Sequence, residues 1–126
     1  MIIENSKPHR KLDAWRKAMQ LVENIYRVTE AFPAGEKFGL TAQIRRAAVS
    51  VPSNIAEGAA DRTVQQFYNY LSNCIGSLNE LDTQLEIAFR LRYLTEKDFI
   101  EINALLDDCL AVTFGLKKHL AKRARG

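Results

Sequence analysis

Apolar residues recur three and four positions apart along four stretches of the chain, and this spacing predicts four amphipathic helices. The most regular stretch follows Thr63, and its apolar positions are Val64, Phe67, Leu71, Cys74, Leu78, Leu81, Leu85 and Ala88. A second regular stretch runs from about residue 96 to residue 122, with inward positions at Phe99, Ile102, Leu106, Cys109, Thr113, Leu116 and Leu120. Alternation of this kind over many turns is typical of helices packed in a bundle.

The first predicted helix spans about Lys11 to Phe32 and carries two neighbouring apolar stripes. One stripe consists of Leu12, Trp15, Met19, Val22 and Tyr26, and the other of Ala14, Ala18, Leu21, Ile25, Val28 and Phe32. Together they cover about half of the helix, whereas a helix that serves one core needs an apolar arc of only about 100°. Two interpretations stay open. Either one stripe faces a second surface, or both form one broad face buried in a compact bundle.

The second predicted helix follows a breaker cluster at Phe32–Gly35 and begins between residues 36 and 41. It ends between residues 58 and 60, where we expect Gly58 to act as a C-terminal cap. Pro52 lies inside it and removes one backbone hydrogen bond, so we expect a kink. A split into two short helices is the alternative.

Two threonines mark the beginnings of the last two helices. Thr63 with Gln66, and Thr95 with Asp98, have the spacing of helix N-caps. Four long helices joined by short loops predict an all-α fold, an antiparallel up-down-up-down four-helix bundle. We expect a single bundle domain over residues 11–126, preceded by a flexible N-terminal arm over residues 1–10.

A row of polar residues borders the apolar stripe of the second helix. This polar seam consists of Gln43, Arg46, Ser50, Asn54 and Glu57, which lie three or four positions apart and can touch their neighbours. We favour a hydrogen-bonded seam that fixes helix register or forms a subunit interface. Exposure to solvent and a ligand or catalytic site are the alternatives, and no second group identifies a catalytic partner for the seam.

Composition narrows the class of protein. The chain has 126 residues, of which 47% are hydrophobic and 26% charged, as expected for one globular domain. Its two cysteines, Cys74 and Cys109, lie on apolar stripes without a CxxC partner, so we expect reduced core thiols. With no membrane-length apolar run, metal-ligand spacing or phosphate-binding loop in the sequence, we expect a cytoplasmic protein that is not an enzyme and needs no cofactor or metal.

Positive charge is concentrated near both ends of the chain. The formal net charge is +3, yet residues 7–17 carry +4 and residues 117–126 carry +5, which leaves −6 for the remainder. In the predicted topology these two segments lie at one end of the bundle, where they form a basic end able to bind phosphates. The candidate nucleic-acid-binding residues are Lys11, Arg16, Lys17, Lys117, Lys118, Lys122 and Arg123. Solvated charge that keeps the protein soluble is the alternative.

Several short motifs together resemble a known family. The residues that carry the resemblance are Leu12 with Trp15, Phe32-Pro33, Glu36, Gly39-Leu40, Gln43-Ile44-Arg45-Arg46-Ala47, Ser50, Pro52, Asn54-Ile55-Ala56-Glu57-Gly58, Gly76-Ser77-Leu78 and Glu80-Leu81. They are similar to the 23S ribosomal RNA intervening-sequence proteins, also called the S23 ribosomal protein family. The resemblance implies a four-helix bundle and a pentameric ring. It also implies kinship with the accessory proteins of diversity-generating retroelements, which bind nucleic acid and a reverse transcriptase.

These observations favour a non-enzymatic, oligomeric four-helix bundle that acts as a binding module. Its expected partners are further copies of itself, in a pentamer, and RNA, DNA or a nucleoprotein bound through the basic end. A structural or protein–protein adaptor without a nucleic-acid role is the competing function. No membrane association is expected.

Overall fold

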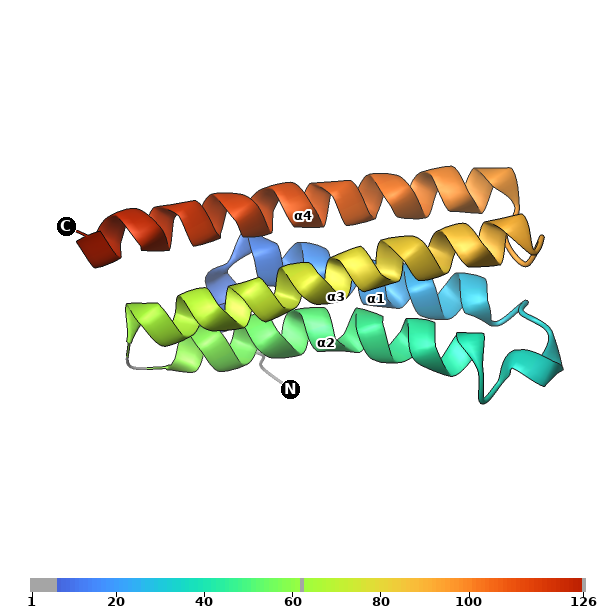
Figure 1. Cartoon of the computed structure of the whole chain (residues 1–126), viewed down its shortest axis with the longest axis horizontal. Coiled ribbons are helices and arrows are strands. Elements are labelled where there is room, and N and C mark those ends of the chain that lie inside the picture. Colours follow the sequence, from blue (N-terminus) through green and yellow to red (C-terminus); the bar gives the residue numbers. More distant parts are fainter. Residues whose placement is uncertain (1–6, 62, 126) are drawn as a thin grey trace, which may run out of the picture.

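The computed structural model describes residues 7–61 and 63–125, and this part of the chain forms four α-helices without any strand (Figure 1). The elements in chain order are η1 (Pro8–Lys11), α1 (Asp13–Thr29), η2 (Ala34–Glu36), α2 (Leu40–Ala60), α3 (Val64–Arg90) and α4 (Glu96–Arg125), where η denotes a 3₁₀ helix. The prediction of an all-α fold with four helices is confirmed.

The chain before α1 is organised differently from the expectation. The helix predicted from Lys11 begins at Asp13, because Pro8–Lys11 form a separate 3₁₀ turn in contact with α2. Arg16 holds this turn in place by donating hydrogen bonds to the carbonyl oxygens of Arg10 (3.3 Å) and Lys11 (3.0 Å). Of the predicted flexible arm, residues 1–6 lie outside the described residues.

One hydrophobic core joins all four helices. Its fully buried side chains include Leu21 and Ile25 of α1, Ile44 of α2, Leu81 of α3 and Leu106 of α4. The stripe of α1 that consists of Ala14, Ala18, Leu21, Ile25 and Val28 is buried throughout. Phe32 is also buried, but it follows α1, which ends at Thr29 and not at Phe32 as predicted. Pro52 is buried inside one continuous α2, so the alternative of two short helices is wrong. The apolar stripe stays in phase on both sides of the proline, and its packing therefore holds the helix together.

Hydrogen-bonded caps begin three of the helices. Thr63 Oγ1 accepts a hydrogen bond from the Gln66 amide, and Thr95 Oγ1 accepts one from the Asp98 amide, each at 3.1 Å, so both predicted N-caps are confirmed. Glu36 caps α2 by accepting a hydrogen bond from the Leu40 amide at 3.1 Å. Glu36 therefore stabilises the turn that leads into α2.

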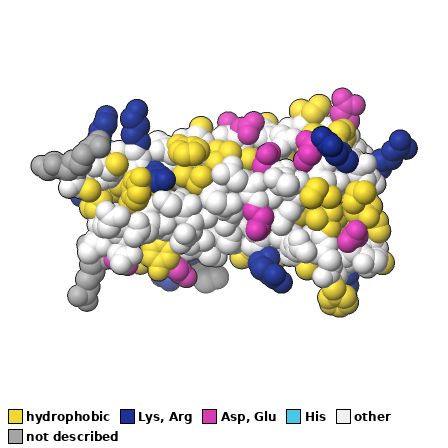
Figure 2. All heavy atoms as spheres, viewed as in Figure 1, with side chains coloured by type: hydrophobic (Ala, Val, Ile, Leu, Met, Phe, Trp, Pro, Cys, Tyr) yellow, Lys and Arg dark blue, Asp and Glu magenta, His cyan; other side chains and the backbone are white. Residues whose placement is uncertain are grey.

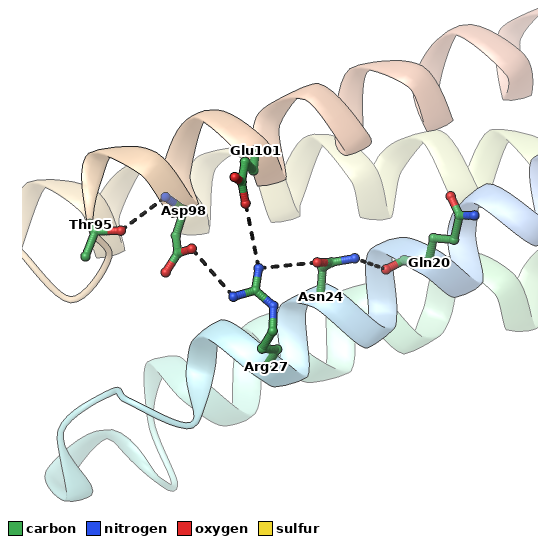
Figure 3. Close-up of polar contacts among 6 residues, drawn as sticks. All are labelled: Gln20, Asn24, Arg27, Thr95, Asp98 and Glu101. Carbon is green, nitrogen blue, oxygen red and sulfur yellow. Dashed lines mark hydrogen bonds and ion pairs between the residues drawn. The ribbon is translucent and has the colours of Figure 1, made fainter.

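A polar cluster ties α1 to α4 (Figure 3). Arg27, near the end of α1, lies 3.6 Å from the carboxylate of Asp98 and 4.0 Å from that of Glu101, both near the start of α4. Arg27 also donates a hydrogen bond to Asn24 Oδ1 at 3.3 Å. These contacts are partly exposed and each contributes little free energy, but together they hold the two helices in one register.

The side chains of Cys74 and Cys109 are buried and unbridged, in agreement with the expected reduced core thiols. Burial raises the pKa of the Cys74 thiol to about 12 and that of the Cys109 thiol to about 11. Because the thiolate is the reactive form, both cysteines are inert packing groups at neutral pH.

Candidate functional site

The middle of the polar seam lies against α3 and is hydrogen-bonded. The hydroxyl groups of Ser50 and Ser77 share a hydrogen bond of 2.7 Å between α2 and α3. Asn54 Nδ2 donates a hydrogen bond to the Ser50 carbonyl oxygen at 2.8 Å. The bond between Ser50 and Ser77 joins α2 to α3, whereas the bond of Asn54 lies within α2.

The other seam residues, Gln43, Arg46 and Glu57, are exposed in the single chain. Within the described residues, neither Arg46 nor Glu57 takes part in a hydrogen bond or an ion pair. On the helical wheel these two lie further from the buried stripe than Ser50 and Asn54, which explains their exposure. Ser50 thus joins the seam to α3, whereas Gln43, Arg46 and Glu57 are exposed.

A small polar pocket of about 270 Å³ lies where the seam meets α3 and is lined by Gln43, Arg46, Glu80 and Gln84. Gln84 is only 9% exposed, and its Oε1 has no hydrogen-bond partner within the described residues. The pocket contains no paired nucleophile and base, which a covalent or acid–base mechanism requires. Its groups can accept or donate hydrogen bonds to a docked surface.

The neighbouring arginine, Arg45, has the interactions that the sequence did not lead us to expect. Its Nε donates a hydrogen bond to Thr29 Oγ1 at 2.8 Å, and its guanidinium lies 4.4 Å from the centre of the Tyr26 ring. The carboxylate of Glu30 lies 3.6 Å from Arg45 Nη2. On the helical wheel, Arg45 lies at the edge of the apolar stripe of α2, on the side that faces α1. This position is the feature of the sequence that could have predicted its contacts with α1.

The second apolar stripe of α1 remains partly exposed. Met19 is 36% exposed and Tyr26 39%, and on α2 the side chain of Val49 is 40% exposed. Between these helices lies a hollow of about 290 Å³, the α1–α2 groove, lined by Trp15, Met19, Val22, Val49, Pro52, Ser53 and Ala56. These exposures favour the interpretation in which α1 serves its own core on one side and a second surface on the other.

The seven basic candidates come from η1, the first turns of α1 and the last turns of α4. Figure 1 shows the last turns of α4 continuing beyond the start of α1. Figure 2 shows Lys and Arg side chains at both ends of the visible face. The merging of the two charged segments into one basic end stays a prediction.

The basic side chains also differ in their availability. Arg16 is held by an ion pair with Asp13 at 3.1 Å as well as by its backbone contacts, and Lys117 Nζ lies 4.8 Å from the centre of the Tyr68 ring. Lys11, Lys118, Lys122 and Arg123 are exposed. The last turns of α4 therefore present three of these four exposed candidates.

Within the described residues, no group of three or more His, Cys, Asp or Glu side chains could hold a metal ion. No helix of this part of the chain is both long and apolar enough to cross a membrane.

The model of the 23S rRNA-intervening sequence protein family matches residues 10–115. The chain belongs to this family. A protein of unknown function from the S23 ribosomal protein family of Bacteroides thetaiotaomicron has a similar crystal structure, with a TM-score of 0.77. It is 22% identical over 83% of this chain and 95% of its own chain, a likeness that concerns the fold alone. No curated protein matches the sequence.

In this member of the family, many residues that carry the family resemblance stabilise the fold. Glu36 caps α2, Arg45 joins α1 to α2, and Ser50 with Ser77 joins α2 to α3. Arg46 and Glu57 belong to the same motif, yet they are exposed and have no partner within the described residues. Folding of one chain therefore leaves the roles of these two residues unexplained.

Proposed function

We propose that this chain is a non-enzymatic binding module that assembles from several copies of an antiparallel, up-down-up-down four-helix bundle. Contacts between the end of one helix and the start of another support the antiparallel arrangement. Arg27, near the end of α1, contacts Asp98 near the start of α4, and Gly58, near the end of α2, lies against Phe67 near the start of α3.

The observation that carries the proposal is the uncovered face of α1 and α2. The α1–α2 groove supplies an apolar centre, and the exposed Arg46 and Glu57 lie beside it on α2. Stable protein interfaces have this composition, an apolar centre surrounded by a polar rim. We assign this face to contact between copies, and the family resemblance favours five copies in a closed ring.

Assembly is tested by the mass of the protein in solution. Light scattering at micromolar concentration should give a closed oligomer, and a pentamer would have five times the chain mass of 14.3 kDa. Burial of an apolar face is favourable in proportion to the area removed from water, so assembly should persist on dilution through the low micromolar range. A constant mass of 14.3 kDa would contradict the proposed assembly.

The proposed ligand of the assembled module is RNA or DNA, bound at the end of α4. The exposed Lys118, Lys122 and Arg123 support this assignment, and a ring of copies multiplies their charge. The kinship with nucleic-acid-binding accessory proteins of retroelements, implied by the motif, is part of the same proposal. Phosphate contacts carry no direct sequence information, so binding should be weakly selective for sequence.

Replacing Lys118, Lys122 and Arg123 together by glutamine should weaken binding and reduce its dependence on salt. Each phosphate contact on single-stranded nucleic acid adds about 0.7 to the slope of log K against log salt, and about 0.9 on duplex DNA. Three lost contacts should therefore flatten the slope by about 2 to 3. Gel-shift titrations of RNA and DNA at two salt concentrations measure the effect.

The matched control replaces Arg90, Arg92 and Lys97, which are exposed around the turn between α3 and α4, by glutamine. This control removes the same charge and should keep the wild-type slope. Equal weakening by both triple variants would contradict a site at the end of α4. Wild-type protein that shifts neither RNA nor DNA at low salt would favour the structural or protein–protein adaptor.

A further inference from the structure

Among the described residues, Phe38 is the large hydrophobic side chain that is most exposed. It is 89% exposed, compared with 51% for Phe114 on α4. The contact described for its ring is with the ammonium group of Lys37, 5.5 Å from the ring centre. An aromatic ring in water forgoes the burial that normally stabilises it, so the ring of Phe38 is available to a second surface.

The turn that carries Phe38 is held in a defined shape. The Glu36 carbonyl accepts a hydrogen bond from the Gly39 amide at 2.9 Å, and one carboxylate oxygen of Glu36 accepts a hydrogen bond from the Leu40 amide. The other carboxylate oxygen accepts a hydrogen bond from the Tyr93 hydroxyl at 2.9 Å, which raises the pKa of Tyr93. The ring is therefore presented on a preorganised turn, which lowers the entropic cost of docking it.

The α1–α2 groove has the size and lining to receive an aromatic ring. Its volume is about 290 Å³, and its walls include Trp15, Met19, Val22 and Pro52. Phe38 cannot reach the groove of its own chain. The groove residue of α2 nearest in sequence, Val49, lies nine residues after Leu40, and this separation corresponds to about 14 Å along α2.

The charges around the ring and the groove are complementary. Lys37, beside Phe38, is exposed, and so are Glu57 on α2 and Glu23 on α1. Glu23 follows the groove residue Val22, and Glu57 lies one turn after the groove residue Ser53. None of these three side chains has an ion pair within the described residues. Arg46 and Arg10 also border the groove, so a second copy that inserts Phe38 would bring its Lys37 toward the part of the border formed by Glu23 and Glu57, which favours that orientation.

We infer that the Phe38 ring of one copy inserts into the α1–α2 groove of a second copy, with Lys37 facing Glu23 and Glu57 on the border of the groove. This inference rests on the proposed assembly and names the residues that hold it together. The contact joins two different surfaces of the chain and is therefore heterologous, the kind of contact that closes a ring when the rotation between copies allows it. The turn before α2 thus acts as the connector of the assembly.

Two variants, Phe38→Asp and Val49→Arg, test the contact from its two sides. Each residue is at least 40% exposed in the single chain, so neither change should unfold it. Light scattering should find each variant alone as a monomer of 14.3 kDa. Mixed in equal amounts, they should form a complex of twice that mass, because Phe38 of the Val49→Arg protein can enter the intact groove of the Phe38→Asp protein.

Phe114→Asp is the matched control, since it makes the same change at another exposed phenylalanine and should keep the wild-type mass. Unchanged mass for Phe38→Asp would overturn the inference while leaving the proposed assembly in place. A mixture that stays monomeric, or a Phe114→Asp protein that also dissociates, would overturn it too. Wild-type protein that is itself monomeric would remove the proposed assembly and the inference together.

Discussion

Replacing Gly58 by valine should lower the free energy of unfolding by about 3 kcal/mol. The expected C-terminal cap is not the role of this glycine, since α2 continues to Ala60 and no described glycine has a positive φ. A β-carbon at Gly58 would instead lie 2.8 Å from Phe67 Cδ1 and 2.8 Å from Tyr70 Cβ. Tyr70 Cβ is fixed to the backbone of α3, so the two helices would have to move apart.

Gly76 provides the control for this substitution, because it also lies inside a helix but a β-carbon there would have no neighbour within 4 Å. Gly76→Ala should raise the free energy of unfolding by about 0.5–1 kcal/mol through helix propensity. Urea denaturation of both variants measures the difference. A Gly58→Val protein as stable as wild type would refute the close packing of α2 on α3.

Substitution of the adjacent residues Arg45 and Arg46 should affect the free energy of unfolding to different extents. Arg45→Ala should lower the free energy of unfolding by about 2 kcal/mol, because it removes a charged hydrogen bond to Thr29 and the contact with the Tyr26 ring. Arg46→Ala should change the stability of the single chain by no more than about 0.5 kcal/mol, since the side chain is exposed and unpaired within the described residues.

Thermal or urea denaturation measures both effects. The two arginine variants should be compared at a protein concentration where both have the same oligomeric state. Arg46→Ala is also expected to weaken assembly, because Arg46 lies beside the proposed interface. Equal loss of stability in the two variants would show that the seam arginine is buried or paired in a way that the single chain does not provide.

Most of the helical architecture could be predicted because it depends on local chemistry. The spacing of apolar residues identified the buried face of α3, from Leu71 to Ala88, and the threonines at 63 and 95 marked two helix starts. A cap needs only a side-chain oxygen three residues before an amide, and a helical face needs only periodic burial. Neither depends on how the helices meet.

The candidate site was predicted only in part, because burial of a polar residue depends on which helix lies beside it. The pattern grouped Ser50, Asn54, Arg46 and Glu57 in one seam, but only α3 decides that Ser50 meets Ser77 while Arg46 and Glu57 face outward. The pairing of Arg45 with Thr29 likewise spans sixteen residues of sequence. Such contacts follow from packing between distant segments and leave no periodic signal.

By itself the sequence determined that this chain is all-α, which residues form its core and where its charge is concentrated. Only the tertiary structure decided that Gly58 is a point of close helix contact and that Phe38 remains uncovered beside a turn held by Glu36. The physical reason is the range of the forces involved. Helix propensity and hydrophobic periodicity act within a few residues, whereas close packing, helix overhang and exposure are properties of how whole helices are placed against each other.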